Sequence, residues 1–232
     1  MATANPLPPL PKTQRPAALK RWLSKVKLAS GGHSSPQDGA CLLEVVAYVQ
    51  RRDFNDHPVC VAPTIAAFGR TWNDSLPDAE RQRLKRFIPL MVDTATTKAD
   101  ETTRAWMATD WLVREFAPVW LDRAGLTEHA AKLRALEALS SAALAKKAQP
   151  IIDDACRASS AAWAAAWAAA GAAAGAAAWA AARDAAGYAA RAAAFKTKPT
   201  NRAAMDAALA PTVQQLQASA EDLLERMCAV GR

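Results

Sequence analysis

The sequence contains none of the short motifs that identify the common classes of enzyme and metalloprotein. It has no glycine-rich phosphate loop, no serine nucleophile elbow and no Asp-x-Asp pair. It also lacks the CxxC, HxxxH and HExxH spacings of standard metal sites. The absence of a complete catalytic motif favours a protein that acts by binding.

Signals for β-strands and for export are scarce as well. No segment sustains the two-residue alternation of a half-buried strand, and alanine, a strong helix former, recurs throughout. The N-terminus has no apolar segment as long as the core of a secretory signal. The cysteines stand far apart, at positions 41, 60, 156 and 228, which is typical of reduced thiols. We therefore expect an all-α, cytoplasmic protein.

Positive charge is concentrated at the start of the chain. Residues 1–30 contain six cations and no carboxylate, whereas the net charge of the whole chain is +7. Five prolines favour an extended, disordered arm over residues 1–16. Residues 17–28 have the spacing of a short basic amphipathic helix, which can follow phosphates or a membrane surface. The alternative is a solvated tail that packs one tryptophan onto the body. The six cations, taken as candidate binding residues, are Lys12, Arg15, Lys20, Arg21, Lys25 and Lys27.

Periodicity and helix caps predict three parts. These are a basic Pro-rich arm over 1–30, a compact Trp-rich helical body over 31–148, and an Ala-rich helical region over 149–232 that can share one core with the body. Pro118 is expected to kink or end one helix, and Pro150 to end another. The helices are expected at about 40–51, from 63 onward, at 77–87, 101–116 and 127–147, and in a final helix whose buried stripe is Val213, Leu216, Ala220, Leu223, Leu224 and Met227.

The alanine-rich region contains an unusual repeat, WAAAWAAAGAAAGAAAW at residues 163–179. The 25 residues between Arg157 and Arg183 comprise 18 Ala, 3 Trp, 2 Gly and 2 Ser, without a charge. Length and the GxxxG spacing admit a transmembrane helix. Alanine burial contributes little, however, and no Leu, Ile, Val or Phe is present, so we do not expect a membrane span.

Two interpretations of this repeat remain. One is a densely packed helical hairpin, broken near Gly171–Gly175 or Gly187, because residues 151–195 as one helix would be about 65 Å long. The other is a partner-binding helix anchored by Trp163, Trp167 and Trp179. The small residues would also suit a homo-oligomer formed through the Ala-rich helices.

The densest group of reactive side chains lies in HSSPQDGACLLE (33–44) and NDHPVC (55–60). Cys41 with Glu44, and His57 with Cys60, are spaced to share a helix face. If the two segments are adjacent, Cys41, His57 and Cys60 can meet around Zn with His33 or Glu44 as the fourth ligand. The alternative is structural: the cysteines are buried as small hydrophobes, and His57 completes a helix cap.

A cysteine nucleophile is a further candidate. Cys41 is expected in the first turn of a helix, where the helix dipole lowers a thiol pKa. His57 or His129 would act as the base, oriented by Asp56 or Glu44. Gln37 precedes Cys41 by four residues, as an oxyanion donor would.

Four segments together resemble a group of uncharacterised proteins encoded by actinobacteria and tailed phages. The resemblance covers most of residues 33–232 and implies a bacterial cytosolic or mobile-element origin, but it brings no activity and no residue roles. The segments are GACLLEVVAYV (39–49), DHPVCVAPTIAAFGRTWNDSLPDAERQRL (56–84), ATDWLVREFAPVWL (108–121) and LAPTVQQLQASAEDLLERM (209–227).

These observations predict a non-enzymatic binding protein, a phage or mobile-element accessory factor whose basic arm engages a host protein or nucleic acid. Two alternatives stay open. One is a metal-dependent or cysteine-dependent enzyme centred on Cys41, Glu44, His57 and Cys60. The other is a protein that inserts its Ala/Trp helix into a membrane.

Overall fold

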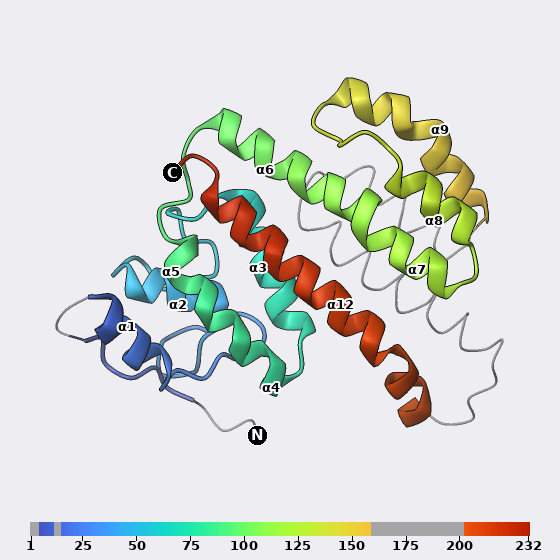
Figure 1. The fold of residues 1–232 in the computed structure, drawn as a ribbon. Helices are drawn as coiled ribbons and strands as arrows, with labels where there is room; N and C mark the ends of the chain where they lie inside the picture. The colour runs from blue at the N-terminus through green and yellow to red at the C-terminus, as the bar shows by residue number, and fades with distance from the viewer. Residues whose placement is uncertain (1–4, 12–14, 159–201) are drawn as a thin grey trace. The chain divides into compact units, whose positions relative to one another are not determined.

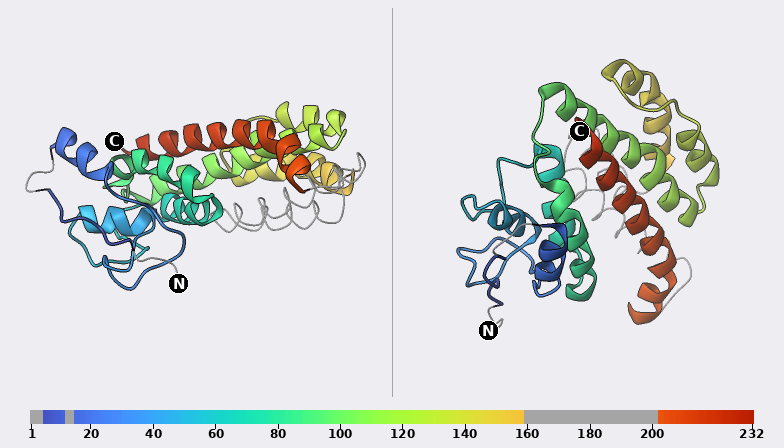
Figure 2. Two further views of the ribbon diagram at one scale, coloured as in Figure 1. Left: turned by 90° about the horizontal axis from the view of Figure 1, so that it is seen from below. Right: turned by 60° about the vertical axis from the view of Figure 1, so that its left-hand side comes forward.

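The structure, a computed structural model, describes residues 5–11, 15–158 and 202–232. Within these ranges every regular element is a helix and no strand occurs, so the expected all-α fold is confirmed (Figures 1 and 2). The elements are α1 (Pro16–Leu23), α2 (Leu42–Val49), α3 (Pro63–Ser75), α4 (Asp78–Arg81), the 3₁₀ helix η1 (Gln82–Phe87), α5 (Ile88–Met91), α6 (Lys98–Trp111), the π-helical η2 (Leu112–Phe116), α7 (Ala117–Arg123), α8 (Thr127–Arg134), α9 (Ala142–Ala158) and α12 (Arg202–Ala229).

Contacts between residues divide the chain into two compact units. Unit 1 comprises Met1–Glu101 with Cys228–Arg232, and unit 2 comprises Thr102–Met227. Residues 31–148, expected as one body, therefore contribute to both units. The boundary expected at 148/149 falls inside α9, which continues to Ala158.

Helix α2 lies at the centre of unit 1. Seven of its eight residues are buried, because the segment LLEVVAYV is apolar on nearly every side. It contacts α3 and α5 (Figure 1). Each fully buried Leu or Val side chain there stabilises the fold by about 1.5–3 kcal/mol. This helix is therefore a rigid base for the segments on either side of it.

Helix α3 supplies the aromatic part of the same core. Pro63 begins the helix, where its fixed φ angle suits the first turn. Phe68 and Trp72 are buried, with ring centroids 5.7 Å apart, and the ring centroids of Trp72 and Phe87 are 6.1 Å apart. The aromatic cluster thus joins α3 to η1.

The N-terminal segment is ordered against unit 1 in its described part. Trp22 is buried, and its Nε1 donates to the carbonyls of Pro8 and Pro9 at 3.1 and 3.0 Å. The buried Leu7 donates its backbone N–H to Pro36 at 2.8 Å. The structure therefore does not show residues 5–11 and 15–30 as a disordered arm, since burial and hydrogen bonds offset the entropy of ordering them. The alternative expectation, one tryptophan packed onto the body, describes the segment better.

The two prolines expected to interrupt helices have different outcomes. For Pro118 a kink or a helix end was expected, and the helix end does not occur: the π-helical η2 precedes Pro118, and a widened turn accommodates a residue without an N–H. The expectation for Pro150 needs correction. Pro150 lies inside α9 instead of ending a helix. Both Pro150 and Lys146 are exposed, so water can satisfy the Lys146 carbonyl that lacks the Pro150 donor. The helix expected over 127–147 is in fact two, α8 and α9.

The core of unit 2 combines tryptophan with the end of α12. Trp111 and Trp120 are buried, and the ring centroids of Trp111 and Phe116 are 5.2 Å apart. The Nε of Arg104 donates to the Met227 carbonyl at 3.1 Å. The apolar stripe expected on the last helix is buried except for Val213, which is 38% exposed.

The alanine-rich expectations fall largely outside the described residues. The proposed hairpin and the anchors Trp163, Trp167 and Trp179 lie within 159–201, and Lys12 lies within 12–14. Among the helices that the structure describes, none has the length and apolar character needed to cross a bilayer.

Candidate functional site

The predicted metal ligands all lie in unit 1, but they do not converge. Across 5–11, 15–158 and 202–232, no group of three or more His, Cys, Asp or Glu side chains is placed to hold a metal ion. His33, Cys41 and Glu44 are close together, whereas His57 pairs with Asp56 on a separate loop. The predicted zinc site over Cys41, His57 and Cys60 is therefore not formed.

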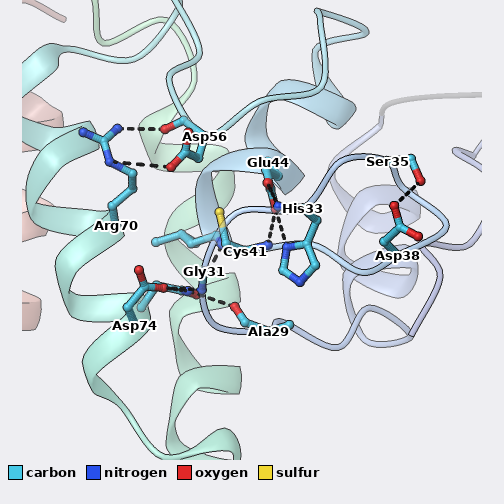
Figure 3. Close-up of polar contacts among 12 residues, drawn as sticks. Ala29, Gly31, His33, Ser35, Asp38, Cys41, Glu44, Asp56, Arg70 and Asp74 are labelled. Atoms are coloured by element: carbon cyan, nitrogen blue, oxygen red, sulfur yellow. Dashed lines mark hydrogen bonds and ion pairs between the residues drawn. The ribbon is translucent and has the colours of Figure 1, made fainter. Parts of the chain in front are cut away.

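Glu44 is the centre of the first cluster (Figure 3). Its side chain is 1% exposed. One carboxylate oxygen accepts the Cys41 backbone N–H at 2.7 Å and contacts the His33 Nδ1 at 2.8 Å, while the other accepts the His33 backbone N–H at 2.5 Å. Glu44 is the third residue of α2 and Cys41 its N-cap, so this is the reach-back half of a capping box. The carboxylate holds the 33–41 loop onto α2 and presents no free oxygen to a substrate.

Cys41 does not have the properties of a nucleophile. It is 3% exposed, and burial raises the pKa of its thiol to about 12. The expected lowering by the helix dipole is outweighed, because desolvation disfavours the thiolate and the Glu44 carboxylate is nearby. Burial likewise raises the pKa of Cys60. Both residues match the structural alternative, in which cysteine acts as a small hydrophobe.

Of the base and carboxylate combinations considered for a cysteine nucleophile, His57 with Asp56 is in contact. The His57 Nδ1 lies 2.6 Å from the Asp56 Oδ1, and the His57 side chain is 69% exposed. Arg70 donates to the Asp56 backbone carbonyl at 2.8 Å. The α3 N-cap is Ala62, so His57 does not complete a helix cap. The pair is an exposed loop contact, and the buried Cys41 thiol is bonded within the other cluster.

Sequence reasoning missed a buried polar network beside Glu44. Asn73 is fully buried; its Oδ1 accepts the Leu42 N–H at 3.2 Å and its Nδ2 donates to the Ala29 carbonyl at 2.9 Å. Asp74 accepts the Gly31 N–H at 2.7 Å (Figure 3). An Asn near the end of an apolar helix face, as at position 73, is the signal in the sequence for such a role. The network fastens the 29–42 segment to α3.

Arg81 is a second buried polar residue that bonds to the backbone of this region. It is 3% exposed, and its Nε and Nη2 donate to the carbonyls of Asn73 and Leu76 at 2.7 and 2.6 Å. These carbonyls belong to the C-terminal end of α3, which a cation stabilises. The sequence predicts a helix at this position but not the burial of Arg81.

A second feature of unit 1 is an apolar groove with cationic groups. It has a volume of about 700 Å³ and lies between α1 and the η1–α5 segment, with Val49 and Gln50 of α2 between them. The α1 wall presents Pro16, Leu19, Lys20, Leu23 and Ser24. The opposite wall presents Lys85, Arg86, Pro89 and Val92. The described residues that line the groove include no carboxylate and no aromatic side chain.

The cations of the opposite wall are held in position. The Lys85 Nζ donates to the Val26 carbonyl at 2.9 Å, and burial lowers the pKa of this ammonium group. The Arg86 guanidinium lies 4.6 Å from the centroid of the Phe87 ring. A nearby anion would offset the desolvation of Lys85, because an opposite charge stabilises the protonated form.

The groove adjoins an exposed cationic surface on and after α1. None of its five side chains has a carboxylate partner within the described part of the chain, and no Asp or Glu occurs before Asp38. These residues, called here the α1 cations, are Arg15, Lys20, Arg21, Lys25 and Lys27. They are five of the six binding residues expected from the sequence.

Comparison of the chain with protein-family models, curated proteins and solved structures finds no match. The resemblance to actinobacterial and phage proteins therefore stays a prediction.

Proposed function

We propose that the chain is a non-enzymatic binding protein that engages an acidic macromolecule through the α1 cations. The observation that carries this proposal is five exposed Lys and Arg side chains that have no carboxylate partner among the described residues, on a segment held by the buried Trp22. Exposed, unpaired cations lose little solvation and no ion pair when an anionic partner binds. In the setting implied by the resemblance, the partner would be a host protein or nucleic acid engaged by a phage or mobile-element accessory factor.

Binding is favoured over catalysis by the state of the reactive residues. The Cys41 thiol is buried with a raised pKa, and Glu44 is occupied by the backbone and ring of His33. An activated nucleophile needs a base within hydrogen-bond reach, and His57 instead contacts Asp56. Glu44 instead holds the 33–41 loop onto α2.

The test is binding of two polyanions, a DNA duplex and polyglutamate, measured by fluorescence anisotropy over a range of salt concentration. The variant carries Lys20→Gln, Arg21→Gln, Lys25→Gln and Lys27→Gln, all at exposed positions. Deleting residues 1–30 is a poorer test, because it removes the buried Trp22 and Leu23. We expect the variant to bind at least one polyanion about tenfold more weakly or worse, with a shallower salt dependence.

The matched control replaces four exposed cations of unit 2 with Gln, namely Lys132, Arg134, Lys146 and Lys147. It removes the same net charge from a different surface, so it should bind within about twofold of wild type if the α1 cations carry the contact. Equal losses in the two variants would mean that only net charge matters. Wild-type affinity in the α1 variant would refute the proposal.

A further inference from the structure

We propose that the groove between α1 and η1–α5 is the docking site for an acidic amphipathic helix of a partner protein. This inference rests on the proposed function and narrows the partner from any acidic macromolecule to a protein segment of one kind.

One wall of the groove, α1, has the periodicity of a helix packing surface. Its lining positions are 16, 19, 20, 23 and 24, which follow one face of the helix. Side chains at such intervals make a ridge against which another helix packs. The opposite wall is less regular, with Lys85 in the 3₁₀ helix η1, Pro89 in α5 and Val92 directly after α5. The groove volume of about 700 Å³ also lies within the range of ligand sites.

The lining chemistry selects an acidic helix over nucleic acid. Leu19, Pro89 and Val92, none of them buried, offer apolar contacts to anchors at helical spacing. Lys20 and Lys85 would face carboxylates that flank those anchors, and none of the described residues that line the groove is a carboxylate. Single-stranded nucleic acid stacks its bases on aromatic side chains, and none is found among the described residues that line this groove.

The probe is a labelled synthetic peptide of about 18 residues, or roughly 27 Å as a helix, with Leu on one face and Glu elsewhere. A scrambled peptide of identical composition is the matched probe, and the DNA duplex and polyglutamate complete the set. Each is titrated into the full chain. We expect the amphipathic peptide to bind about tenfold more tightly than its scrambled form, because only the former presents all its anchors to the groove.

Two variants test whether the peptide binds in the groove. Leu19→Asp places a charge at a half-buried lining residue, and Ser24→Glu places a charge at an exposed lining residue. If Leu19→Asp perturbs folding, Ser24→Glu still tests the site. Both should abolish the preference for the amphipathic peptide and leave polyglutamate binding within about threefold of wild type. The matched control is Leu144→Asp, a half-buried leucine on α9 of unit 2, which should keep the preference.

The outcomes separate this inference from the function on which it rests. Equal affinity for the amphipathic and scrambled peptides overturns the groove assignment while the α1 cations keep their role. A duplex that binds more tightly than the peptide, unaffected by Ser24→Glu, also overturns it and identifies nucleic acid as the partner. Failure of every acidic probe to bind refutes both.

Discussion

Unit 1 contains two sets of charged and polar side chains that are close in sequence but opposite in character. Around Glu44 and Asn73, the carboxylate, the amide and the neighbouring N–H groups are buried and bonded to one another. On α1 the cations are exposed and have no carboxylate partner in the described residues. Buried polar groups that satisfy each other specify a fold, whereas exposed unpaired charges are available to a ligand. The two sets should therefore respond differently to substitution, the first in stability and the second in binding.

The largest expected effect is that of Glu44→Ala. It leaves the Cys41 N–H and two His33 donors without their acceptor, each worth about 1–3 kcal/mol when buried. We expect a loss of about 3 kcal/mol in the free energy of unfolding, measured by urea denaturation of the full chain. Glu128→Ala, at an exposed position of α8, is the matched control and should stay within about 0.5 kcal/mol of wild type. Similar values for the two variants would show that Glu44 does not anchor the loop.

Asn73→Ala should have the next largest effect, about 2 kcal/mol. It strands the Leu42 N–H and the Ala29 carbonyl in the interior. The matched control is Asn55→Ala, on an exposed loop, for which we expect about 0.5 kcal/mol. The same denaturation experiment ranks both, and a smaller loss for Asn73→Ala than for Asn55→Ala would contradict the assignment.

Burial of Cys41 makes the stability of unit 1 depend on pH. Its folded pKa, about 12, lies above the ordinary value of 9.0, so the protonated thiol stabilises the fold fully below pH 9.0 and this contribution is lost as the pH rises towards 12. Between pH 8 and pH 10 we expect wild type to lose about 1 kcal/mol more than Cys41→Ala. Alkaline losses from other groups occur in both proteins and cancel in the difference. Parallel stability curves for the two would mean that the thiol is not desolvated.

The smallest expected effect is that of His57→Ala. Its ring is mostly exposed and contacts only the adjacent Asp56 among the described residues, so unfolding should change by less than about 0.5 kcal/mol. Polyglutamate affinity should also be unchanged. A loss of more than about 1 kcal/mol in the free energy of unfolding would show that the exposed Asp56–His57 pair stabilises the fold, contrary to this account.

Much of the fold was predictable because helix signals are local. The spacing of Leu42, Val45 and Val49 marks a buried helix face, and α2 occupies that segment. Pro150 was misread because its cost depends on whether the Lys146 carbonyl is exposed, which sequence does not show.

Of the candidate functional residues, only those whose exposure follows from the local amino-acid composition could be predicted. The α1 cations were expected because a run of Lys and Arg without acids rarely becomes buried. The grouping of Cys41 with His57 failed, because it depended on how two loops are placed and each histidine had a nearer carboxylate. The groove could not be predicted, since its walls come from segments about 60 residues apart.

The most direct measurement of the difference between the two sets is hydrogen–deuterium exchange of the full chain with and without the amphipathic peptide. We expect slower exchange in segments covering 16–24 and 85–92, which form the groove walls, and no change in 29–44, which the Glu44 network already protects. Protection confined to other segments, with the peptide demonstrably bound, would contradict the assignment of binding to the groove.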